Sequence, residues 1–559
     1  MPMPTTREEQ AATELGTTEI TPGVARALVA AFAVTLITVP LLQWAGELRA
    51  YSAKERNTPW PSAAEILTAP SVALHGWSQA QGNIGHKTLA ANAELLSEIR
   101  RFETSLEDDS IVNINLLGPT RNWLARFAGW GTEEAWIGRD GWLFYRPDLD
   151  YSIGPGFLDP KVLARRQRKG LEFSARRHPD PRPAILDFAR QLELRNIQLV
   201  LVPTPNKAMV HPDRFGGQDN PAPLHNRSWT EFVDTLEAAH ITVFDPLPVL
   251  LERRRRDHTD QFLATDTHWR PEAMEAVAEA LAITLGQLNS LLNSPTRPIW
   301  FRQPREVTGQ GELLKMMRLG PDSKLFEPET VTIQQVLSPF LQHWQPDPTA
   351  PVLVLGDSYT NIYSYNAMGF GQSAGFAEQL AWHLQRPVDS LARNADGAHA
   401  TRRQLARDTR RLEHTRVVVW QFAVRELTSG DWPLIPLPAK HDRPTPQTPQ
   451  TPPPGDSINF PCTILATSGV PTPGTVPYRD AVLSLHASGP TGEEFVIFSM
   501  GMKDNRLTAA SRLKPGDTLT LRLIPWTTVQ QKYGRLNRIE LDDPDFRLVD
   551  LPTYWADPQ

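Results

Sequence analysis

Two short segments of the 559-residue chain carry side chains that could form a nucleophile and its base. The first, Gly356–Tyr359, reads Gly-Asp-Ser-Tyr and directly follows the apolar run Pro351–Leu355, which is typical of a buried strand. A serine at the carboxyl end of a sheet strand lies at the rim of the sheet, where the first N–H groups of the next helix can stabilise an oxyanion. Ser358 is therefore a candidate nucleophile, although the same turn could simply cap a helix.

The second segment, Asp266–Trp269, reads Asp-Thr-His-Trp and precedes a helix that is predicted to begin at Pro271. Residues two apart in an extended segment lie on the same side. The Asp266 carboxylate can therefore orient the His268 imidazole through Nδ1 and leave Nε2 free as a base, which completes the logic of a Ser-His-Asp triad. Two alternatives stay open, namely a metal-binding pair and a helix-capping aspartate beside an uninvolved histidine.

The elements that must position these residues are predicted from short apolar runs separated by helical stretches. Such a pattern favours an α/β fold in which a parallel sheet has helices on both faces and binds ligands at the carboxyl ends of its strands. A hairpin with a glycine turn is also predicted over residues 136–145. The predicted strands are 197–203, 241–244, 351–355, 388–391 and 417–422, and the clearest helices are 184–194 and 271–285.

Residues 24–44 are predicted to cross a membrane. The stretch Ala27–Leu42 carries no charged residue, and a helix of about 21 residues spans a hydrocarbon core of about 30 Å. We expect an uncleaved transmembrane anchor that follows a disordered cytoplasmic tail at 1–23. A cleaved signal peptide and a buried core helix are the alternatives. Arginines occur on both sides of the span, so the charge rule does not decide its orientation.

The rest of the chain divides by composition. We expect a helical stalk or cap at 45–130, a catalytic domain at 131–432 and a proline-rich linker at 433–455. Alternating apolar residues after the linker predict a separate β domain at 456–559, of the OB-like barrel or sandwich type, which could bind carbohydrate or a partner.

The bulk composition excludes some functions. A net charge of −6 without a clustered basic face gives no reason to expect a nucleic acid partner. Cys462 is the only cysteine, so neither a disulfide within the chain nor a cysteine-based metal site can form.

Six segments, taken in their order along the chain, resemble the SGNH-hydrolase-like domain of bacterial alginate O-acetyltransferases and related exopolysaccharide acetylation proteins. The resemblance covers about residues 131–430, and its Asp-x-His pair precedes the nucleophile, the reverse of ordinary SGNH esterases. The segments are Ile137–Tyr145, Val202–Lys207, Asp266–Trp269, Gly309–Leu313, Gly356–Tyr359 and Val419–Phe422.

The resemblance implies roles for individual residues. Ser358 is the implied nucleophile, His268 the base and Asp266 the residue that orients it. The amide of Ser358 is one oxyanion donor, and that of Gly397 is the candidate for a second, unless its segment is an ordinary turn. Where ordinary SGNH esterases carry an asparagine after the later strand, this chain has Gln421, which leaves a third donor open.

Several residues near these segments are candidate substrate contacts. Tyr359 and Trp269 flank the triad and could stack on a sugar, although core packing would equally explain them. Arg425 could bind a polyanionic sugar chain or form a buried salt bridge with Glu426 or another acid. Lys207 and Asn394 are weaker candidates, and neither a metal nor a cofactor is expected.

Together these observations predict a two-step acetyl transfer through an acetyl-serine onto hydroxyls of an exported, alginate-like polysaccharide. The triad does not distinguish a sugar from water as the second nucleophile. An SGNH carbohydrate esterase and a non-catalytic polysaccharide-binding scaffold of a secretion complex are therefore the alternatives. The resemblance also implies an inner-membrane, single-pass protein with a periplasmic catalytic domain, which receives acetyl groups through a membrane-bound O-acyltransferase partner.

Overall fold

The computed structural model divides the chain into two compact units, residues 1–122 and 123–559, which are described separately. The described residues are 21–52, 59–79, 84–85, 87–88, 91–92, 95–96, 98–99, 102–103, 110, 117–169, 177–216, 224–288, 291, 300–319, 323–394, 396–438, 458–471, 479–490, 492–534, 536–539, 541, 548 and 551–556. Most of the predicted tail at 1–23 and of the predicted linker at 433–455 lies outside these residues.

The first unit contains a long apolar helix, α2 (Pro22–Ser52), which extends beyond the predicted span 24–44 at both ends. Its apolar side chains, such as Leu28, Val29 and Phe32, are each more than half exposed. Of the residues that the structure describes, α2 is the one helix long and apolar enough to cross a membrane. It is followed by a 3-10 helix (Ser62–Thr68) and by α3 (Ala69–Gln79).

The second unit is built on a five-stranded parallel sheet, which confirms the predicted fold class. The strand order is β4-β3-β9-β7-β8, so β7 lies between β9 and the edge strand β8. Every residue of β7 and β9 is buried, as expected for a sheet covered on both faces. The strands are β3 (Gln198–Thr204), β4 (Thr242–Val243), β7 (Val352–Gly356), β8 (Val388–Ala392) and β9 (Val417–Ala423).

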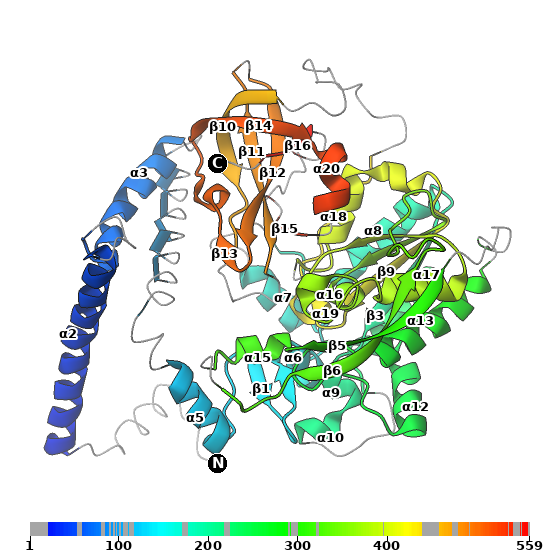
Figure 1. Cartoon of the computed structure of the whole chain (residues 1–559), viewed down its shortest axis with the longest axis horizontal. Coiled ribbons are helices and arrows are strands. Elements are labelled where there is room, and N and C mark those ends of the chain that lie inside the picture. The colour runs from blue at the N-terminus through cyan, green and yellow to red at the C-terminus, as the bar shows by residue number, and fades with distance from the viewer. Residues whose placement is uncertain are drawn as a thin grey trace, which may run out of the picture. The chain divides into compact units, whose positions relative to one another are not determined.

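Helices cover both faces of this sheet (Figure 1). On one face, Phe188 of α8 (Pro181–Glu193) and Arg402 of α18 (Ala400–Arg407) both pack against Trp420 of β9. On the other, α13 (Pro271–Gly286) packs against α17 (Phe376–Leu384). Helix α13 begins where it was predicted to begin, because proline is favoured in the first turn.

The other α-helices described from residue 118 onward are shorter than α8 and α13. They are α5 (Gly118–Ala128), α6 (Arg146–Ile153), α7 (Pro160–Lys169), α9 (Lys207–Val210), α10 (Pro212–Phe215), α11 (Trp229–Ala238), α12 (Leu247–Asp257), α15 (Glu312–Met316), α16 (Ser358–Asn361), α19 (Glu426–Ser429) and α20 (Trp526–Tyr533).

Two antiparallel hairpins accompany the sheet. Strands β1 (Ala135–Ile137) and β2 (Leu143–Tyr145) form the predicted glycine-turn hairpin. Strands β5 (Phe301–Gly309) and β6 (Glu329–Leu337) form a second one, which was not predicted. Strand β5 is exposed along most of its length and contains Pro304, so it lacks the alternation that reveals a half-buried strand.

The C-terminal β domain is a barrel, one of the two predicted forms. Strands β12-β16-β14-β10-β11 are paired in this order, and β11 pairs again with β12, which closes the ring; β13 and β15 are attached at its sides. The strands are β10 (Ile458–Thr467), β11 (Ala481–Ser488), β12 (Glu494–Lys503), β13 (Arg506–Leu507), β14 (Thr518–Pro525), β15 (Asn537–Ile539) and β16 (Thr553–Trp555).

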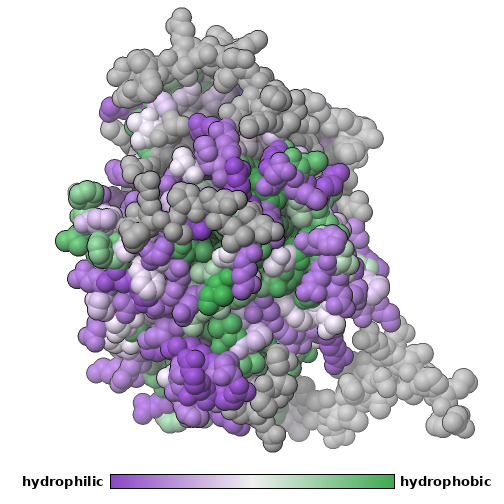
Figure 2. Space-filling view, turned by 90° about the vertical axis from the view of Figure 1, so that its right-hand side faces the viewer, coloured by the Kyte–Doolittle hydropathy of each residue, from purple (hydrophilic) through white to green (hydrophobic). Residues whose placement is uncertain are grey.

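The face of the molecule in Figure 2 is mostly hydrophilic, and hydrophobic residues gather there in small areas. Such a surface is ordinary for a water-facing domain, in which apolar atoms always contribute part of the surface. The exposed apolar surface of α2 is of a different kind, because this helix has the length and composition of a membrane span or a signal sequence.

Candidate active site

The turn that carries Ser358 is fixed to the neighbouring strand by the residue before it. Asp357 is the N-cap of α16, and its Oδ1 accepts the Tyr359 N–H at 2.8 Å. Its Oδ2 accepts the N–H of Ala423 at the end of β9, at 2.7 Å. Gln421 of β9 accepts the Asp357 N–H at 3.1 Å and donates to Thr204 of β3 at 2.9 Å. The Gln421 side chain therefore links β9 to the turn after β7 and to β3. Because its amide is already bonded to Thr204, Gln421 is a poor candidate for the third oxyanion donor.

Ser358 itself lies at the rim of the sheet with its hydrogen-bonding groups available. It is 6 % exposed, and within the described residues neither its Oγ nor its N–H forms a hydrogen bond. Gly397 follows the adjacent strand β8, and its N–H is likewise unbonded among the described residues. Its φ of +74° lies in the left-handed region that side chains disfavour. Both predicted oxyanion donors thus have a free N–H beyond the ends of neighbouring strands.

Asp266 and His268 form the predicted pair. His268 Nδ1 lies 2.5 Å from Asp266 Oδ1, which also accepts the His268 backbone N–H at 3.0 Å. A bridge between Phe262 and Trp269 folds this segment back on itself and holds the pair in place. The His268 Nε2 is buried and has no hydrogen-bond partner. One ring nitrogen is therefore fixed and the other is free, as a general base requires.

The serine-bearing and histidine-bearing segments lie side by side, although ninety residues separate them. The Tyr359 hydroxyl donates to the Thr267 carbonyl at 2.9 Å, and the Trp269 indole donates to the Tyr359 carbonyl at 3.1 Å. The His268 ring packs against the Tyr359 ring at 4.8 Å between centroids. No hydrogen bond joins Ser358 Oγ to His268 Nε2, although such bonds often form only when substrate binds.

These contacts correct one expectation. Tyr359 and Trp269 are fully buried, so neither ring offers a face on which a sugar could stack. Both rings instead pack in the core, where they connect the segment that bears Ser358 to the segment that bears His268.

Glu312, which was not predicted to have a role, completes the site. Its N–H donates to Asp266 Oδ2 at 2.8 Å, its carboxylate is hydrogen-bonded to the Thr267 hydroxyl, and its Oε1 lies 3.7 Å from His268 Nδ1. Gly311 makes this approach possible, because a Cβ there would lie 2.0 Å from the Thr265 carbonyl oxygen. Glu312 lies in Gly309–Leu313, one of the six segments of the resemblance. Its acidic side chain, between a glycine and an apolar residue, is the signal that could have marked it as a site residue.

Burial and charge set the protonation of this cluster. Burial alone would lower the pKa of His268, but the Asp266 and Glu312 carboxylates outweigh it and raise that pKa above its ordinary value. Burial would raise the pKa of Asp266, but the imidazolium and its hydrogen bond lower it. Burial and the Asp266 charge raise the pKa of Glu312. The cluster therefore favours an ionised Asp266 and a His268 that is more basic than an ordinary histidine.

One ligand atom from each of Asp266, His268 and Glu312 lies within 4.8 Å of the others, which is close enough for a shared metal ion. The 2.5 Å separation of Asp266 Oδ1 and His268 Nδ1 is a hydrogen-bond distance. Two ligands that bind one zinc ion at about 2.1 Å would lie about 3 Å apart or more. The second oxygen of Asp266 is held by the Glu312 N–H. The donor set therefore fits a proton network better than a metal ion.

Glu312→Gln is expected to move the acid limb of the kcat/KM profile to lower pH. The base must be neutral to work, so activity rises as pH passes through the pKa of His268. Glu312 raises that pKa, so the uncharged amide should lower it. The other groups facing the imidazole, Asp266, Arg425 and Tyr359, stay unchanged.

The matched control is Glu306→Gln, which removes a charge from the exposed surface of β5 and should leave the profile unchanged. An acid limb at the same pH in Glu312→Gln and in the unaltered protein would show that Glu312 carries no charge when His268 titrates.

Arg425 lies beside the site in an ion pair with an acid that the sequence did not single out. Its guanidinium donates to Asp148 at 3.1 Å and lies over the rings of Tyr145 and Tyr359. Burial would lower the pKa of Arg425, but the Asp148 charge raises it well above its ordinary value. Asp148, rather than Glu426, is thus its partner. The other N–H groups of Arg425 have no acceptor among the described residues and remain free for a substrate.

The structure gives Lys207 and Asn394 structural roles. The Lys207 ammonium is buried and donates to the carbonyls of Leu143 and Ala264, at 2.8 and 3.1 Å, which ties the β1–β2 hairpin to the Asp266 segment. The Asn394 amide is fully buried and bonded to Asn361 and to the Met368 sulfur. Neither side chain is accessible to a sugar in this structure, contrary to expectation.

Lys207→Met is therefore expected to act on stability rather than on substrate binding. It removes the ammonium that binds both carbonyls, although the Ala264 carbonyl keeps the Leu143 N–H as a donor at 2.8 Å. This loss should cost about 1–3 kcal/mol at pH 7. Burial lowers the pKa of Lys207 from 10.5 to about 8. The unfolded chain then binds more protons in this range, so the unaltered protein should gain stability relative to Lys207→Met as pH rises from about 8 to 10.5.

Chemical denaturation at pH 7 and pH 10 measures this difference, with exposed Lys161→Met as the control. A raised KM for the acceptor with unchanged stability would instead make Lys207 a substrate contact.

Comparison with known proteins supports the resemblance seen in the sequence. A family model described as "SGNH hydrolase-like domain, acetyltransferase AlgX" matches residues 135–424, slightly more than half of the chain. A protein named "Probable alginate O-acetylase AlgJ" from Pseudomonas aeruginosa is 28% identical over 305 residues, which are 52% of this chain and 70% of that protein. Its namesake from Pseudomonas putida is 25% identical over 299 residues, or 52% and 69% of the two chains.

Two solved structures are also similar. The O-acetyltransferase domain of Pseudomonas putida AlgJ matches with 24% identity and a TM-score of 0.40, covering 53% of this chain and 92% of that domain. Pseudomonas aeruginosa AlgX matches with 12% identity and a TM-score of 0.37, covering 71% and 92%. Because the family model spans both the Asp266–Trp269 segment and the Gly356–Tyr359 turn, this chain belongs to the family of SGNH hydrolase-like domains of the acetyltransferase AlgX.

Proposed function

We propose that this protein is an O-acetyltransferase that moves acetyl groups onto hydroxyls of an exported polysaccharide through an acetyl-serine. One observation carries the proposal: a buried Asp266–His268 pair with a free Nε2 lies beside the segment that bears an unbonded serine hydroxyl. Membership of the family supports the acetyl group, and the names of the relatives support a polysaccharide acceptor.

In the first step, His268 Nε2 takes the proton of Ser358 Oγ while that oxygen attacks the carbonyl carbon of the acetyl donor. The negative oxygen that develops is stabilised by the free N–H groups of Ser358 and Gly397. When the tetrahedral intermediate collapses, the leaving group takes the proton from His268, and Ser358 holds the acetyl group as an ester. Asp266 keeps the imidazole in the required tautomer throughout.

In the second step, a sugar hydroxyl gives its proton to His268 and attacks the acetyl carbon. The bond between that carbon and Ser358 Oγ breaks, and Oγ recovers the proton. The free N–H groups of Arg425 can orient a hydroxyl or a carboxylate of the acceptor. Water would complete the same cycle as hydrolysis, so acceptor specificity separates the transferase from an esterase.

The location of the reaction is part of the proposal. Helix α2 would anchor the chain in the inner membrane by a single span, and the catalytic domain would lie in the periplasm. Acetyl groups would then come through a membrane-bound O-acyltransferase partner.

The experiment follows one acetyl group. The full chain in detergent is mixed with a small acetyl ester, and intact mass is recorded before and after polysaccharide is added. We expect an acetylated enzyme that loses the group to the polysaccharide, and His268→Ala should form none. Loss of the group to water at the same rate with and without polysaccharide would identify an esterase, and absence of any acetylated enzyme would exclude the proposal.

A further inference from the structure

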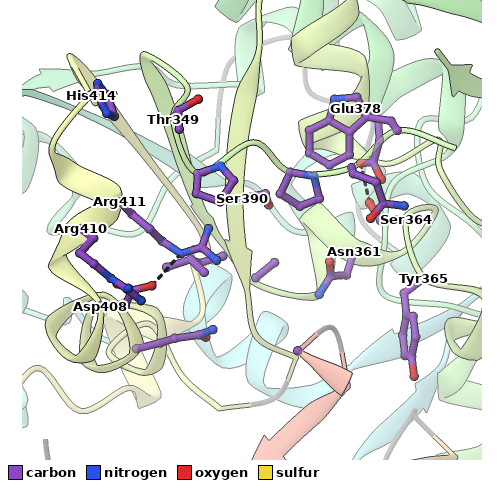
Figure 3. Close-up of a pocket in the computed structure, with 18 of the residues that line it drawn as sticks. Thr349, Asn361, Ser364, Tyr365, Glu378, Ser390, Asp408, Arg410, Arg411 and His414 are labelled. Atoms are coloured by element: carbon purple, nitrogen blue, oxygen red, sulfur yellow. Dashed lines mark hydrogen bonds and ion pairs between the residues drawn. The ribbon is translucent and has the colours of Figure 1, made fainter. Parts of the chain in front are cut away.

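The molecule contains a cavity of about 640 Å³ that is not lined by Ser358 or His268. It lies at β8, the edge strand of the sheet, and is shown in Figure 3. Asn361, Ser364, Tyr365 and Glu378 line it on one side of the strand in this view, and Asp408, Arg410 and Arg411 on the other. This volume is sufficient for a few sugar rings.

The cavity begins one short helix away from the candidate nucleophile. Asn361 and Ser358 are the last and first residues of α16, so their Cα atoms are separated by a helical rise of about 4.5 Å. The Asn361 amide donates to Asn394, in the segment between β8 and Gly397. A polymer with one sugar at Ser358 would therefore place a neighbouring sugar near the cavity.

The lining has the chemistry of a carbohydrate site. The hydroxyl groups of Ser364 and Thr349 donate within the protein and keep acceptor capacity, and the Ser390 hydroxyl has no partner among the described residues. Gln345 and Gln404 add side-chain amides, and the rings of Tyr365 and two prolines add apolar surface. Sugars present the same combination, with hydroxyl groups at the ring edge and C–H groups on the ring face.

The charges of the lining disfavour an acidic polymer. Arg410 Nε donates to Asp408 at 2.8 Å, and Arg411 donates to Asp389 at 2.5 Å, so both guanidiniums already face carboxylates. Glu378 and Glu413 are two further acids among the lining residues. The three carboxylates and two guanidiniums of the lining give a net charge of −1. A chain of uronates would meet guanidiniums whose charge is already balanced by carboxylates, together with the excess negative charge of the lining.

We propose that this cavity is an acceptor subsite for an uncharged stretch of polysaccharide, and that the natural acceptor is not a polyuronate at this position. The proposal rests on the proposed function and adds the substrate class. According to the proposal, the cavity binds neutral glycans in preference to acidic ones.

Binding measurements on the full chain in detergent test the proposal without depending on chemistry. Calorimetric titrations use a neutral β-linked glucose hexamer and an oligomannuronate of equal length, with Ser358→Ala present to prevent turnover. We expect the neutral hexamer to bind at least about tenfold more tightly than the oligouronate. Equal or tighter binding of the oligouronate would overturn the proposal, as would the absence of binding by both.

Two variants localise the binding. Ser390→Trp fills the cavity and should weaken the neutral hexamer at least about tenfold, whereas Ala238→Trp, on the exposed surface of α11 beside the opposite edge strand β4, should not. Glu413→Lys changes the net charge of the lining from negative to positive and should therefore strengthen oligouronate binding. This variant tests the proposal if Ser390→Trp fails to fold. Hexamer binding that Ser390→Trp leaves unchanged in a folded protein would place the subsite elsewhere.

The two proposals fail differently. If the cavity is not a subsite, acetyl-enzyme still forms from a small ester. If the chain is not a transferase, no acetyl group reaches a sugar, yet the neutral hexamer can still bind.

Discussion

Ser358→Ala is expected to lower acetyl transfer by about 10⁴-fold or more and to abolish the acetylated enzyme. The hydroxyl has no partner among the described residues and lies at the end of a strand whose turn is held by Asp357. The substitution removes only that oxygen, so the turn should keep its bonds to Tyr359 and Ala423. Intact mass after exposure to an acetyl ester and initial rates of transfer measure the two effects.

The control is Ser429→Ala, which removes an exposed hydroxyl that donates to the Arg425 carbonyl. Its activity should stay within about twofold of the unaltered protein. An acetyl group that still attaches to the Ser358→Ala protein and reaches the polysaccharide would show that another residue is the nucleophile. Full acetylation in cells that carry Ser358→Ala would favour the scaffold alternative.

Asp266→Asn is expected to lower kcat by about 10³- to 10⁴-fold with little change in KM. Both carboxylate oxygens accept hydrogen bonds, from His268 at one and from the Glu312 N–H at the other. An amide has one acceptor oxygen, so its NH₂ must face either the imidazole or the Glu312 N–H. Facing the imidazole, it would impose the wrong tautomer; facing the N–H, it would set two donors against each other.

A second Asp–His pair in the chain provides the matched control. His225 Nε2 lies 2.9 Å from Asp245 Oδ2, and the His225 ring stacks on Trp229. Among the described residues, neither member of this pair is hydrogen-bonded to the Asp266–Trp269 or Gly356–Tyr359 segment. Asp245→Asn should therefore leave kcat within about twofold. Equal losses in the two variants would show that Asp266 acts on folding alone, and normal activity of Asp266→Asn would remove it from the mechanism.

The two large effects should not be additive. If Ser358, His268 and Asp266 act in one proton relay, the double variant Ser358→Ala, Asp266→Asn should be about as slow as Ser358→Ala alone. A further loss of about 10³-fold in the double variant would mean that the carboxylate contributes independently of the serine.

The candidate site illustrates how much a sequence reveals about residues that do chemistry. Ser358, His268 and Asp266 could be proposed because each lies in a segment whose local pattern is informative: a turn after an apolar strand, and an extended Asp-x-His before a helix. The roles of Trp269 and Tyr359 could not be decided in the same way. An aromatic residue beside a catalytic one can face either the solvent or the core, and burial follows from the packing of α16 against the Asp266 segment.

The sequence by itself determined the parallel sheet, the glycine-turn hairpin, the C-terminal β domain and the apolar span, because apolar runs and turn residues are local signals. The tertiary structure alone decided which charged groups meet. Arg425 pairs with Asp148, 277 residues away, rather than with the adjacent Glu426, and the Glu312 carboxylate comes within 3.7 Å of the His268 imidazole, 44 residues away. Such partners are selected by burial, because a charge removed from water must take whichever opposite charge the packed elements bring to it, and no local pattern records that choice.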